Sequence, residues 1–258
     1  MSEIKGITKI VVSGINGKMG KVILSEVAKR KDCVVVGGVD VRESEYNPIP
    51  IFKDAGEINV DCDVIIDFSH PSALESLLGY AKSNNKPMVM CTTGYSKDQI
   101  EKIKEASKRN PVFFSGNMSL GINLLIELSK KAQSVFSTGF DVEIVEKHHN
   151  QKIDAPSGTA LMIADGISSV REDNVKYVYD RHSYRKPRAK NEIGIHSIRG
   201  GTIVGEHEVI FAGHDEVFSI SHIAQSKEIF AVGSINAAIF LNGKEAGLYD
   251  MSDMLRES

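Results

Sequence analysis

Two imidazoles and an ammonium group stand close together near the middle of this 258-residue chain. They belong to His148, His149 and Lys152, and the carboxylate of Glu146 precedes the first of them by two residues. Histidine and lysine side chains can donate protons in a reaction, and their positive charges attract an anionic substrate. Glu146 could orient an imidazole or favour its charged form. These residues predict a site that binds a carboxylate-bearing molecule and protonates it.

The residues that follow predict the beginning of a helix. Pro156 and Ser157 stand just before Gly158 and Thr159, and the apolar run 160–164 comes next. Proline and small hydroxyl residues are typical of a helix start. The first N–H groups of a helix have no partner within it and carry partial positive charge. We therefore expect this helix to offer its N-terminus to a substrate carboxylate.

The same residues could instead have no role in chemistry and form only a solvated loop and a tight turn before a helix. The run 142–145 is typical of a strand, and adjacent strand residues point to opposite faces, so His148 and His149 cannot easily act on one atom. No zinc site is expected, because no Cys or His recurs nearby at a structural or HExxH-like spacing. The combination with a second set of residues, near the N-terminus, makes us favour a functional site.

The second set has the order of a dinucleotide-binding unit. An apolar run at 9–13 leads into Gly14, Gly17 and Gly20; a helical pattern and another apolar run follow, and this run ends at Asp40. The distance of about 20 residues from the glycines to the acid fits the fingerprint of such units. The pattern is GxxGxxG, with an asparagine where the usual second glycine stands, and alone it could mark an ordinary strand-to-helix turn. In this context we favour nucleotide binding.

Strand and helix patterns continue to alternate through the first half of the chain. Apolar runs at 63–68, 87–91 and 111–115 each end in small or polar residues, with helical patterns between them. Open α/β sheets bind their ligands at the carboxyl ends of their strands, although Ser, Thr and Gly end many strands for structural reasons alone. The alternation predicts an α/β fold with a Rossmann-like parallel sheet.

The second half of the chain contains a different pattern, with a period of two between 194 and 226. Runs at 202–211 and 216–223 are joined by four residues that are typical of a hairpin. Phe218 and Ile220 would face one side of this sheet, and the serines next to them the other. We therefore expect a sheet with one covered face and one face free to meet solvent or another subunit.

Composition limits the partners and the compartment. With a net charge of −3, the chain gives no reason to expect nucleic acid or an anionic membrane surface. The basic segment 181–190 is expected to be a mobile, solvated loop, and no apolar run approaches the roughly 20 residues of a membrane span. Cys33, Cys62 and Cys91 are scattered, and the chain begins without a signal-peptide core, so reduced thiols in the cytoplasm are expected.

Residues 146–160 resemble the signature of the dihydrodipicolinate reductase family, ExHHxxKxDAPSGTA; here they read EKHHNQKIDAPSGTA. The motif is long and specific, and the likeness extends over nearly the whole chain. It implies an enzyme of diaminopimelate and lysine biosynthesis that uses NADH or NADPH to reduce a cyclic dicarboxylate, 4-hydroxy-tetrahydrodipicolinate. The product is tetrahydrodipicolinate, and water is lost.

The resemblance also implies roles for single residues. His148 is expected to protonate the ring, and Lys152 to act as a second proton donor and ion partner. His149, Gly158 and Thr159 are expected to contact substrate carboxylates. The residues expected to bind the cofactor are Gly14, Ile15, Asn16, Gly17, Lys18, Met19, Asp40, Cys91, Thr92, Thr93, Ser115, Gly116, Asn117 and Met118.

The family likeness implies that the C-terminal segment returns to the nucleotide domain. We thus expect a Rossmann-like nucleotide domain at 1–118 and 229–258, and an α+β substrate domain with a mostly open mixed or antiparallel sheet at 119–228. A homotetramer assembled through the substrate-domain sheets is also implied. Two alternatives are another two-domain NAD(P)-dependent dehydrogenase, which would lack the signature, and a non-catalytic NAD-sensing protein, which would have lost the proton donors.

One departure from some family members concerns the choice of cofactor. Where they have Glu-Arg, this chain has Asp40 and Val41. Asp40 can accept a hydrogen bond from the ribose 2′-hydroxyl of NADH but would repel the 2′-phosphate of NADPH. Lys18 and Arg42 are cations within reach of such a phosphate. We therefore expect use of both cofactors, with a preference for NADH.

Overall fold

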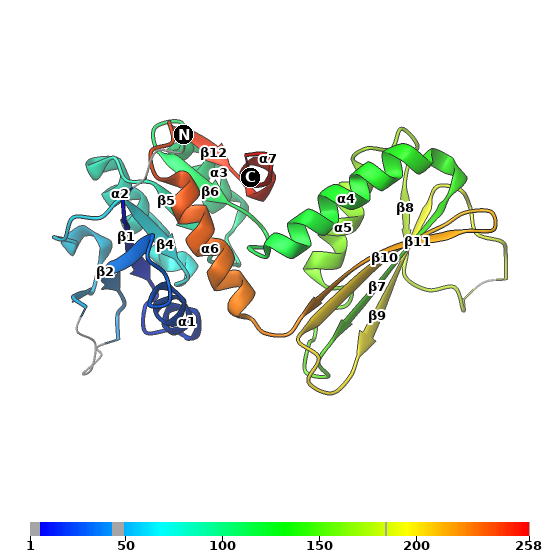
Figure 1. The fold of residues 1–258 in the computed structure, drawn as a ribbon, viewed down its shortest axis with the longest axis horizontal. Helices are drawn as coiled ribbons and strands as arrows, with labels where there is room; N and C mark the ends of the chain where they lie inside the picture. The colour runs from blue at the N-terminus through cyan, green and yellow to red at the C-terminus, as the bar shows by residue number, and fades with distance from the viewer. Residues whose placement is uncertain (1–5, 43–48, 184, 258) are drawn as a thin grey trace. The chain divides into compact units, whose positions relative to one another are not determined.

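The computed structural model of the chain describes residues 6–42, 49–183 and 185–257. The chain divides into two compact units (Figure 1). One unit comprises Met1–Ser119 and Glu228–Ser258, and the other Leu120–Lys227. Because the chain leaves the first unit once and returns to it, the two units are joined by two connections.

The first unit is built on a sheet of seven parallel strands in the order β12-β6-β5-β4-β1-β2-β3. This confirms the predicted Rossmann-like sheet. The strand order reverses between β1 and β4, and such a switch point is where open α/β sheets bind their ligands. The strands are β1 (Thr8–Ser13), β2 (Cys33–Val39), β3 (Ile51–Phe52), β4 (Val64–Asp67), β5 (Met88–Met90), β6 (Pro111–Phe114) and β12 (Gly247–Tyr249).

Most helices of this unit lie between its strands in the sequence. Helix α6 follows the return from the second unit, and α7 follows the last strand, β12. The first helix begins at Lys18, because the glycine turn passes directly into it. None of the helices in the described part of the chain is both long enough and apolar enough to cross a membrane. The helices and 3₁₀ turns are α1 (Lys18–Val27), η1 (Ala55–Glu57), η2 (Pro71–Ala73), α2 (Leu74–Asn84), α3 (Lys97–Ser107), α6 (Glu228–Leu241) and α7 (Met251–Arg256).

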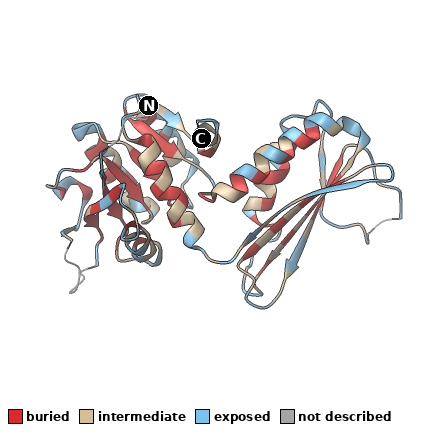
Figure 2. Cartoon of the chain, viewed as in Figure 1, coloured by how far each residue is buried: buried red, intermediate tan, exposed pale blue. Residues whose placement is uncertain are grey.

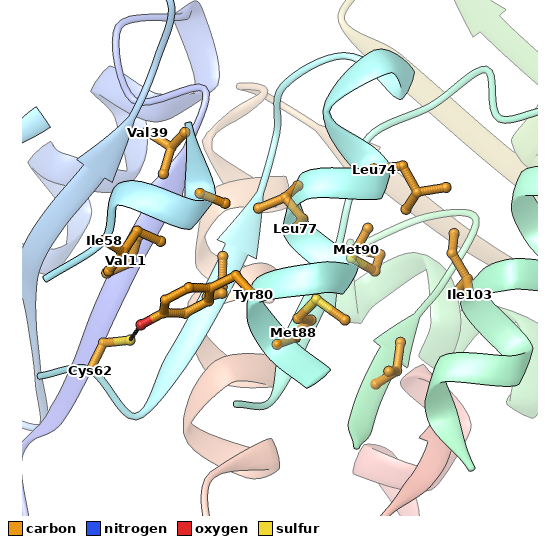
Figure 3. Packing of buried hydrophobic residues seen from close by; sticks show 14 residues of the cluster. Val11, Val39, Ile58, Cys62, Leu74, Leu77, Tyr80, Met88, Met90 and Ile103 are labelled. Atoms are coloured by element: carbon orange, nitrogen blue, oxygen red, sulfur yellow. Dashed lines mark hydrogen bonds between the residues drawn. The ribbon is translucent and has the colours of Figure 1, made fainter. Parts of the chain in front are cut away.

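A hydrophobic cluster fixes the α2 side of this sheet (Figure 3). Leu74, Leu77 and Tyr80 of α2 pack in the same cluster as Met88 and Met90 of β5. These side chains are buried, and burial of a large apolar side chain contributes about 1.5–3 kcal/mol. The packing holds the carboxyl ends of the central strands in place, where the predicted ligand-binding residues lie.

The second unit is a mixed five-stranded sheet with two helices on one face. Its order is β11-β10-β7-β9-β8; β10 is antiparallel to both neighbours, whereas β7, β9 and β8 are parallel to one another. The predicted mixed sheet is thus confirmed. The elements are α4 (Leu120–Phe136), η3 (Ser137–Gly139), β7 (Asp141–His148), α5 (Gly158–Ser168), β8 (Lys176–Val178), β9 (Glu192–Arg199), β10 (Gly205–Ala212) and β11 (Val217–Ala224).

Burial alternates along the central strands of this sheet (Figure 2). On β7, every second residue from Val142 to His148 is buried, and on β10 the same holds from Gly205 to Phe211. Helices α4 and α5 pack against this face. Alternate residues on the other face remain partly or fully exposed, as the period of two predicts.

Two parts of the sequence prediction for this sheet need correction. The strand expected from residue 202 begins only at Gly205, because residues 200–204 turn the chain between β9 and β10. Strand β9 was not recognised as a separate strand. Its first four residues, 192–195, are all buried, so this half of the strand shows no alternation of exposed and buried positions.

The basic segment 181–190 contains no helix or strand among its described residues, and Tyr184 lies outside them. The expectation that its charges are solvated is wrong for two arginines. Arg181 and Arg188 each donate a hydrogen bond to the carboxylate of Glu143, at 3.1 and 3.2 Å. These two arginines therefore attach the basic segment to strand β7.

A close approach in α6 leads to a test of the packing. A Cβ atom at Gly233 would lie 1.7 Å from the carbonyl oxygen of Met118, whereas a Cβ at Gly79 in α2 would meet nothing within 4 Å. We expect Gly233→Ala to lower the free energy of unfolding by about 1–3 kcal/mol or more, because the main chain must move. Gly79→Ala should raise it by about 0.5–1 kcal/mol through helix propensity. Urea unfolding measures both, and a Gly233→Ala variant as stable as Gly79→Ala would contradict this packing.

Candidate active site

The predicted proton-donor site is organised around the carboxylate of Glu146, which is fully buried. Strand β7 directs Glu146 and His148 to the same covered face, because residues two apart in a strand share a face. One oxygen, Oε2, lies 2.6 Å from Nδ1 of His148 and accepts a bond of 2.8 Å from Arg199. The other, Oε1, accepts bonds of 2.7 Å from Arg199 and 3.1 Å from the N–H group of Ser157. One carboxylate therefore joins two strands and the start of α5.

These donors keep Glu146 ionised. Burial alone would raise the pKa of its carboxyl group, but hydrogen bonds from Arg199, Ser197 and His148 outweigh it and lower the pKa to about 2. A buried carboxylate that accepts several hydrogen bonds is an acceptor only, so the nitrogen of His148 that faces it must carry a proton. The other ring nitrogen, Nε2, is left to hold or release a proton toward a substrate.

His148 is buried at the end of β7, and burial is the main cause that lowers its pKa below the usual value. Glu146 acts in the opposite direction, and the charges of Lys152 and Arg199 lower the pKa further. A second imidazole, His207 of β10, lies with its ring centre 5.3 Å away, edge-on to the ring of His148. Burial is also the main reason that the pKa of His207 falls to about 4, so this second ring is neutral at neutral pH.

The N-terminus of α5 is fixed beside these histidines by Ser157. Its hydroxyl caps the helix by accepting a bond of 3.1 Å from the N–H group of Ala160, and it lies 3.1 Å from Nε2 of His207. Gly158 and Thr159 open the helix, as expected. Because N–H groups in a first turn have no carbonyl partner within the helix, this end can receive a carboxylate.

Lys152 lies in the turn between β7 and α5. Its ammonium group forms an ion pair of 2.8 Å with the half-exposed carboxylate of Asp154, and its N–H group donates to the carbonyl oxygen of His149. His149 itself is partly exposed. All five residues that were expected to contact the substrate thus belong to β7, the turn after it and the first turn of α5.

Three residues of this cluster were missed by the sequence analysis. Arg199 stands opposite His148 in the parallel register of β9 and β7, and no local pattern relates residues that are so far apart in the chain. Ser157 was treated only as part of a helix start. His207 did carry a signal, because it occupies an inward position of a strand whose other inward residues include Val209 and Phe211.

The glycine turn of the first unit has the geometry that a dinucleotide needs. Gly14 adopts a positive φ of 79°, and a Cβ there would lie 2.5 Å from the carbonyl oxygen of Phe68. Gly17 is the N-cap of α1, and a Cβ at Gly20 would lie 2.4 Å from the carbonyl oxygen of Gly14. The turn is therefore as tight as a backbone that approaches a pyrophosphate requires.

Asp40 lies at the carboxyl end of β2, beside this turn. It accepts hydrogen bonds from the N–H group of Asn16 at 2.9 Å and from the N–H and Nε groups of Arg42 at 3.0 and 3.3 Å. Burial would raise the pKa of Asp40, but these bonds lower it overall. A pocket of about 440 Å³ adjoins the turn and is lined in part by Gly14, Gly17, Asp40, Val41 and Arg42.

The other residues expected to bind the cofactor follow β5 and β6. Thr92 is buried, and its hydroxyl donates a bond of 2.7 Å to Asp67 at the end of β4. Asn117 caps the N–H group of Ser119 through a bond of 2.8 Å. Ile15 lies behind the glycine turn, where a Cβ at Gly38 would be 2.5 Å from its side chain, so only its main chain can face a ligand.

The described residues contain no group of three or more His, Cys, Asp or Glu side chains arranged to hold a metal ion. The donors are instead suited to organic anions. The glycine turn, the N-cap at Gly17 and the acid at Asp40 fit the pyrophosphate and ribose of a dinucleotide, because they combine free N–H groups with a hydroxyl acceptor.

Comparison with known proteins covers both units. Residues 8–118 match the family model described as dihydrodipicolinate reductase, N-terminus, and residues 121–255 match that of the C-terminus. The 4-hydroxy-tetrahydrodipicolinate reductase of Clostridium novyi (strain NT) is 50% identical over 250 residues, which are 96% of this chain and 98% of that protein. The enzyme of the same name from Clostridium tetani (strain Massachusetts / E88) is 46% identical over 253 residues, which are 98% and 99%.

Solved structures show the same fold. Dipicolinate-bound dihydrodipicolinate reductase from Paenisporosarcina sp. TG-14 superposes with a TM-score of 0.78 at 22% identity, covering 95% of this chain and 97% of that one. A probable dehydrogenase from Thermotoga maritima superposes with a TM-score of 0.63 at 12% identity, covering 95% and 92%. The two family models and the identity with the curated relatives carry the assignment: this chain belongs to the dihydrodipicolinate reductase family.

Proposed function

We propose that this chain catalyses the NAD(P)H-dependent reduction of 4-hydroxy-tetrahydrodipicolinate to tetrahydrodipicolinate, with loss of water, in the diaminopimelate route to lysine. Relatives named 4-hydroxy-tetrahydrodipicolinate reductase align over nearly the full length of the chain. The observation that carries the proposal is the contact of 2.6 Å between Glu146 and His148 beside the N-terminus of α5. A different dehydrogenase would lack the signature HHxxKxDAPSGT, and a non-catalytic NAD sensor would have lost the proton donors, whereas this chain has the signature with both His148 and Lys152.

The proposed mechanism divides the work between the units. A nicotinamide cofactor, when bound to the first unit, supplies the hydride. Glu146 holds Nδ1 of His148, so that Nε2 faces the substrate and protonates its ring. Lys152 provides a second proton, which leaves with the substrate hydroxyl as water, and it pairs with a carboxylate. The ring loses one proton when the water leaves, so one hydride and one net proton are consumed. His149 and the N–H groups of Gly158 and Thr159 bind the substrate carboxylates, which orients the ring for transfer.

For the cofactor site we propose the full set of expected residues from the glycine turn, Asp40 and the segments after β5 and β6. Asp40 retains acceptor capacity for a ribose 2′-hydroxyl, which favours NADH. Arg42 lies beside it, and its guanidinium comes within 3.8 Å of a Cβ position at Gly17. This cation lessens the repulsion of a 2′-phosphate, so both NADH and NADPH are used and NADH is preferred.

We also propose a cytoplasmic homotetramer assembled through the uncovered face of the five-stranded sheet. Val217 and Ile223 of β11 are 67% and 62% exposed on that face, and Ile198 of β9 is 46% exposed. In the registers of the sheet these residues lie on the side of Lys147 and opposite to the helices. Exposed apolar residues that share one face favour association with another subunit.

The first test concerns the proton donors. His148→Gln should lower kcat by about 10²–10⁴-fold while changing the affinity for NADH little, because general acid catalysis is lost. Lys152→Ala should lower kcat and raise the KM for substrate, since a proton donor and a charge are removed. Lys176→Ala removes an exposed ammonium from β8 and serves as the control. Initial rates with freshly generated substrate measure these effects; near-parental kcat/KM in either site variant would refute the role assigned to it.

The second test concerns the 2′-phosphate. Val41 is 82% exposed, so an arginine fits there without disturbing the fold. In Val41→Arg the new guanidinium can form a charge-assisted hydrogen bond of roughly 1.5–3 kcal/mol with the 2′-phosphate. The ratio of kcat/KM for NADPH to kcat/KM for NADH should therefore rise by about one to two decades. Val41→Ala is the matched control and should leave the ratio unchanged, whereas Arg42→Ala should reduce the use of NADPH. A parental enzyme that clearly prefers NADPH would show that Arg42 or Lys18 outweighs Asp40.

The third test concerns assembly. Ile223→Asp places a charge on the uncovered sheet face and should convert the tetramer to smaller species, because the charge would lose its hydration at an interface. Val135→Asp is the control: Val135 is 66% exposed on α4, the helix that packs against the opposite side of the sheet. Sedimentation velocity measures the mass. A parental chain that is monomeric, or an Ile223→Asp variant that remains tetrameric, would exclude this interface.

A further inference from the structure

Arg199, which no sequence pattern indicated, is committed entirely to the protein. Its Nη1 group donates to Glu146 Oε2 and to the carbonyl oxygen of Ile198, both at 2.8 Å. Its Nη2 group donates to Glu146 Oε1 at 2.7 Å and to the carbonyl oxygen of Asp154 at 2.6 Å. Four donors are thus used, and the remaining nitrogen, Nε, is buried. The N–H group at Nε has no partner but is buried, so Arg199 has no accessible N–H group for a substrate carboxylate and must act through Glu146.

The contact between Glu146 and His148 creates a difficulty that Arg199 resolves. A buried carboxylate 2.6 Å from an imidazole stabilises the imidazolium form and raises its pKa. An imidazolium that is held too firmly is a weak acid, and a general acid works best when its pKa is near the working pH. A guanidinium that forms two parallel bonds to the same carboxylate neutralises most of its charge.

We propose that Arg199 is a positioning residue that neutralises most of the charge of Glu146. This carboxylate then fixes the orientation of the His148 ring without strongly stabilising its protonated form. The inference rests on the proposed function, in which His148 protonates the substrate. It assigns separate tasks to the two members of this ion pair. Glu146 sets the ring orientation and the protonated Nδ1, and Arg199 sets how readily the proton on Nε2 leaves.

The groups around His148 agree with this division. Glu146 faces it from β7, Arg199 from β9, His207 from β10 and Lys152 from the turn that follows β7. Only Glu146 favours the charged ring; burial, Lys152 and Arg199 all lower the pKa of His148, and the outcome is a pKa below the usual value. Burial is the largest of these causes, and the charge of Arg199 acts in the same direction.

Gly205 leaves space beside Nε2 of His148, the nitrogen that would release the proton. A Cβ atom at Gly205, the first residue of β10, would lie 3.2 Å from Nε2 of His148. The absence of a side chain at this position leaves the approach to Nε2 open from β10. The proton is thus accessible at Nε2, while the Nδ1 side is closed by Glu146 and Arg199.

The test measures the titration of His148 itself in the full chain without ligands. The imidazole signals are followed by NMR against pH, and the His148 signal is identified by its loss in His148→Gln. Arg199→Met should raise the midpoint by at least about one pH unit, because an unshared carboxylate then faces the ring. Arg199→Lys keeps a cation and should titrate near the parental value. If Arg199→Met does not fold, Arg199→Gln, which keeps an amide donor but no charge, gives the same test.

A matched control separates charge from packing. Arg171 forms two bonds to Asp173, of 2.8 and 2.6 Å, and its side chain is buried. Arg171→Met should lower stability without moving the His148 midpoint. A midpoint in Arg199→Met that is unchanged or lower, or that moves equally in Arg171→Met, would overturn the proposal.

A kinetic measurement distinguishes this inference from the proposed function. The protonated ring is the acid, so kcat/KM should fall as the pH rises above the pKa of His148. In Arg199→Met this decline should move to higher pH by the same amount as the NMR midpoint, and in Arg199→Lys it should remain near the parental position. A shifted midpoint in a chain that shows no reductase activity would reject the proposed function alone. If the NMR midpoint of His148 shifts in Arg199→Met but the decline of kcat/KM at high pH does not move, Arg199 does not control the proton transfer from His148 to the substrate.

Discussion

The structure of the second unit depends on the cost of burying one carboxylate. An ionised carboxyl group away from water must be compensated by donors, or it destabilises the fold by several kcal/mol. Glu146 has no exposed surface, and donors from β7, β9 and the start of α5 converge on it. Satisfying this charge therefore also fixes the relative positions of His148, the helix N-terminus and the turn that holds Lys152.

Both units place the start of a helix after a strand, where the first-turn N–H groups have no carbonyl partner within the helix. In the first unit, Gly14 and Gly17 let the main chain turn tightly enough to bring the start of α1 to the carboxyl end of β1. In the second, Ser157 caps α5 and its N–H group is held by Glu146. We propose that one helix end binds a pyrophosphate and the other a substrate carboxylate, which would let two anions bind with few cationic side chains.

Much of the fold could be predicted because its signals are local. Gly14 and Asp40 mark the dinucleotide unit at the usual spacing, and the alternation around Phe218 indicates a sheet with one covered face. What could not be predicted depends on register. Arg199 lies opposite His148 only because β9 pairs in parallel with β7, and no pattern near residue 199 specifies that pairing. Arg188 illustrates the same limit, since its charge suggested a solvated loop but its partner Glu143 lies on a strand distant in sequence.

The central claim, that this chain reduces a cyclic dicarboxylate at the site around His148, is tested most directly by turnover of the purified parental chain. Freshly generated 4-hydroxy-tetrahydrodipicolinate is supplied with NADH, and loss of NADH and formation of tetrahydrodipicolinate are followed together. The account predicts one NADH oxidised for each product molecule formed, with the rate greatly reduced in His148→Gln. No substrate-dependent oxidation of NADH or NADPH by the folded parental chain, or equal turnover by His148→Gln, would contradict it.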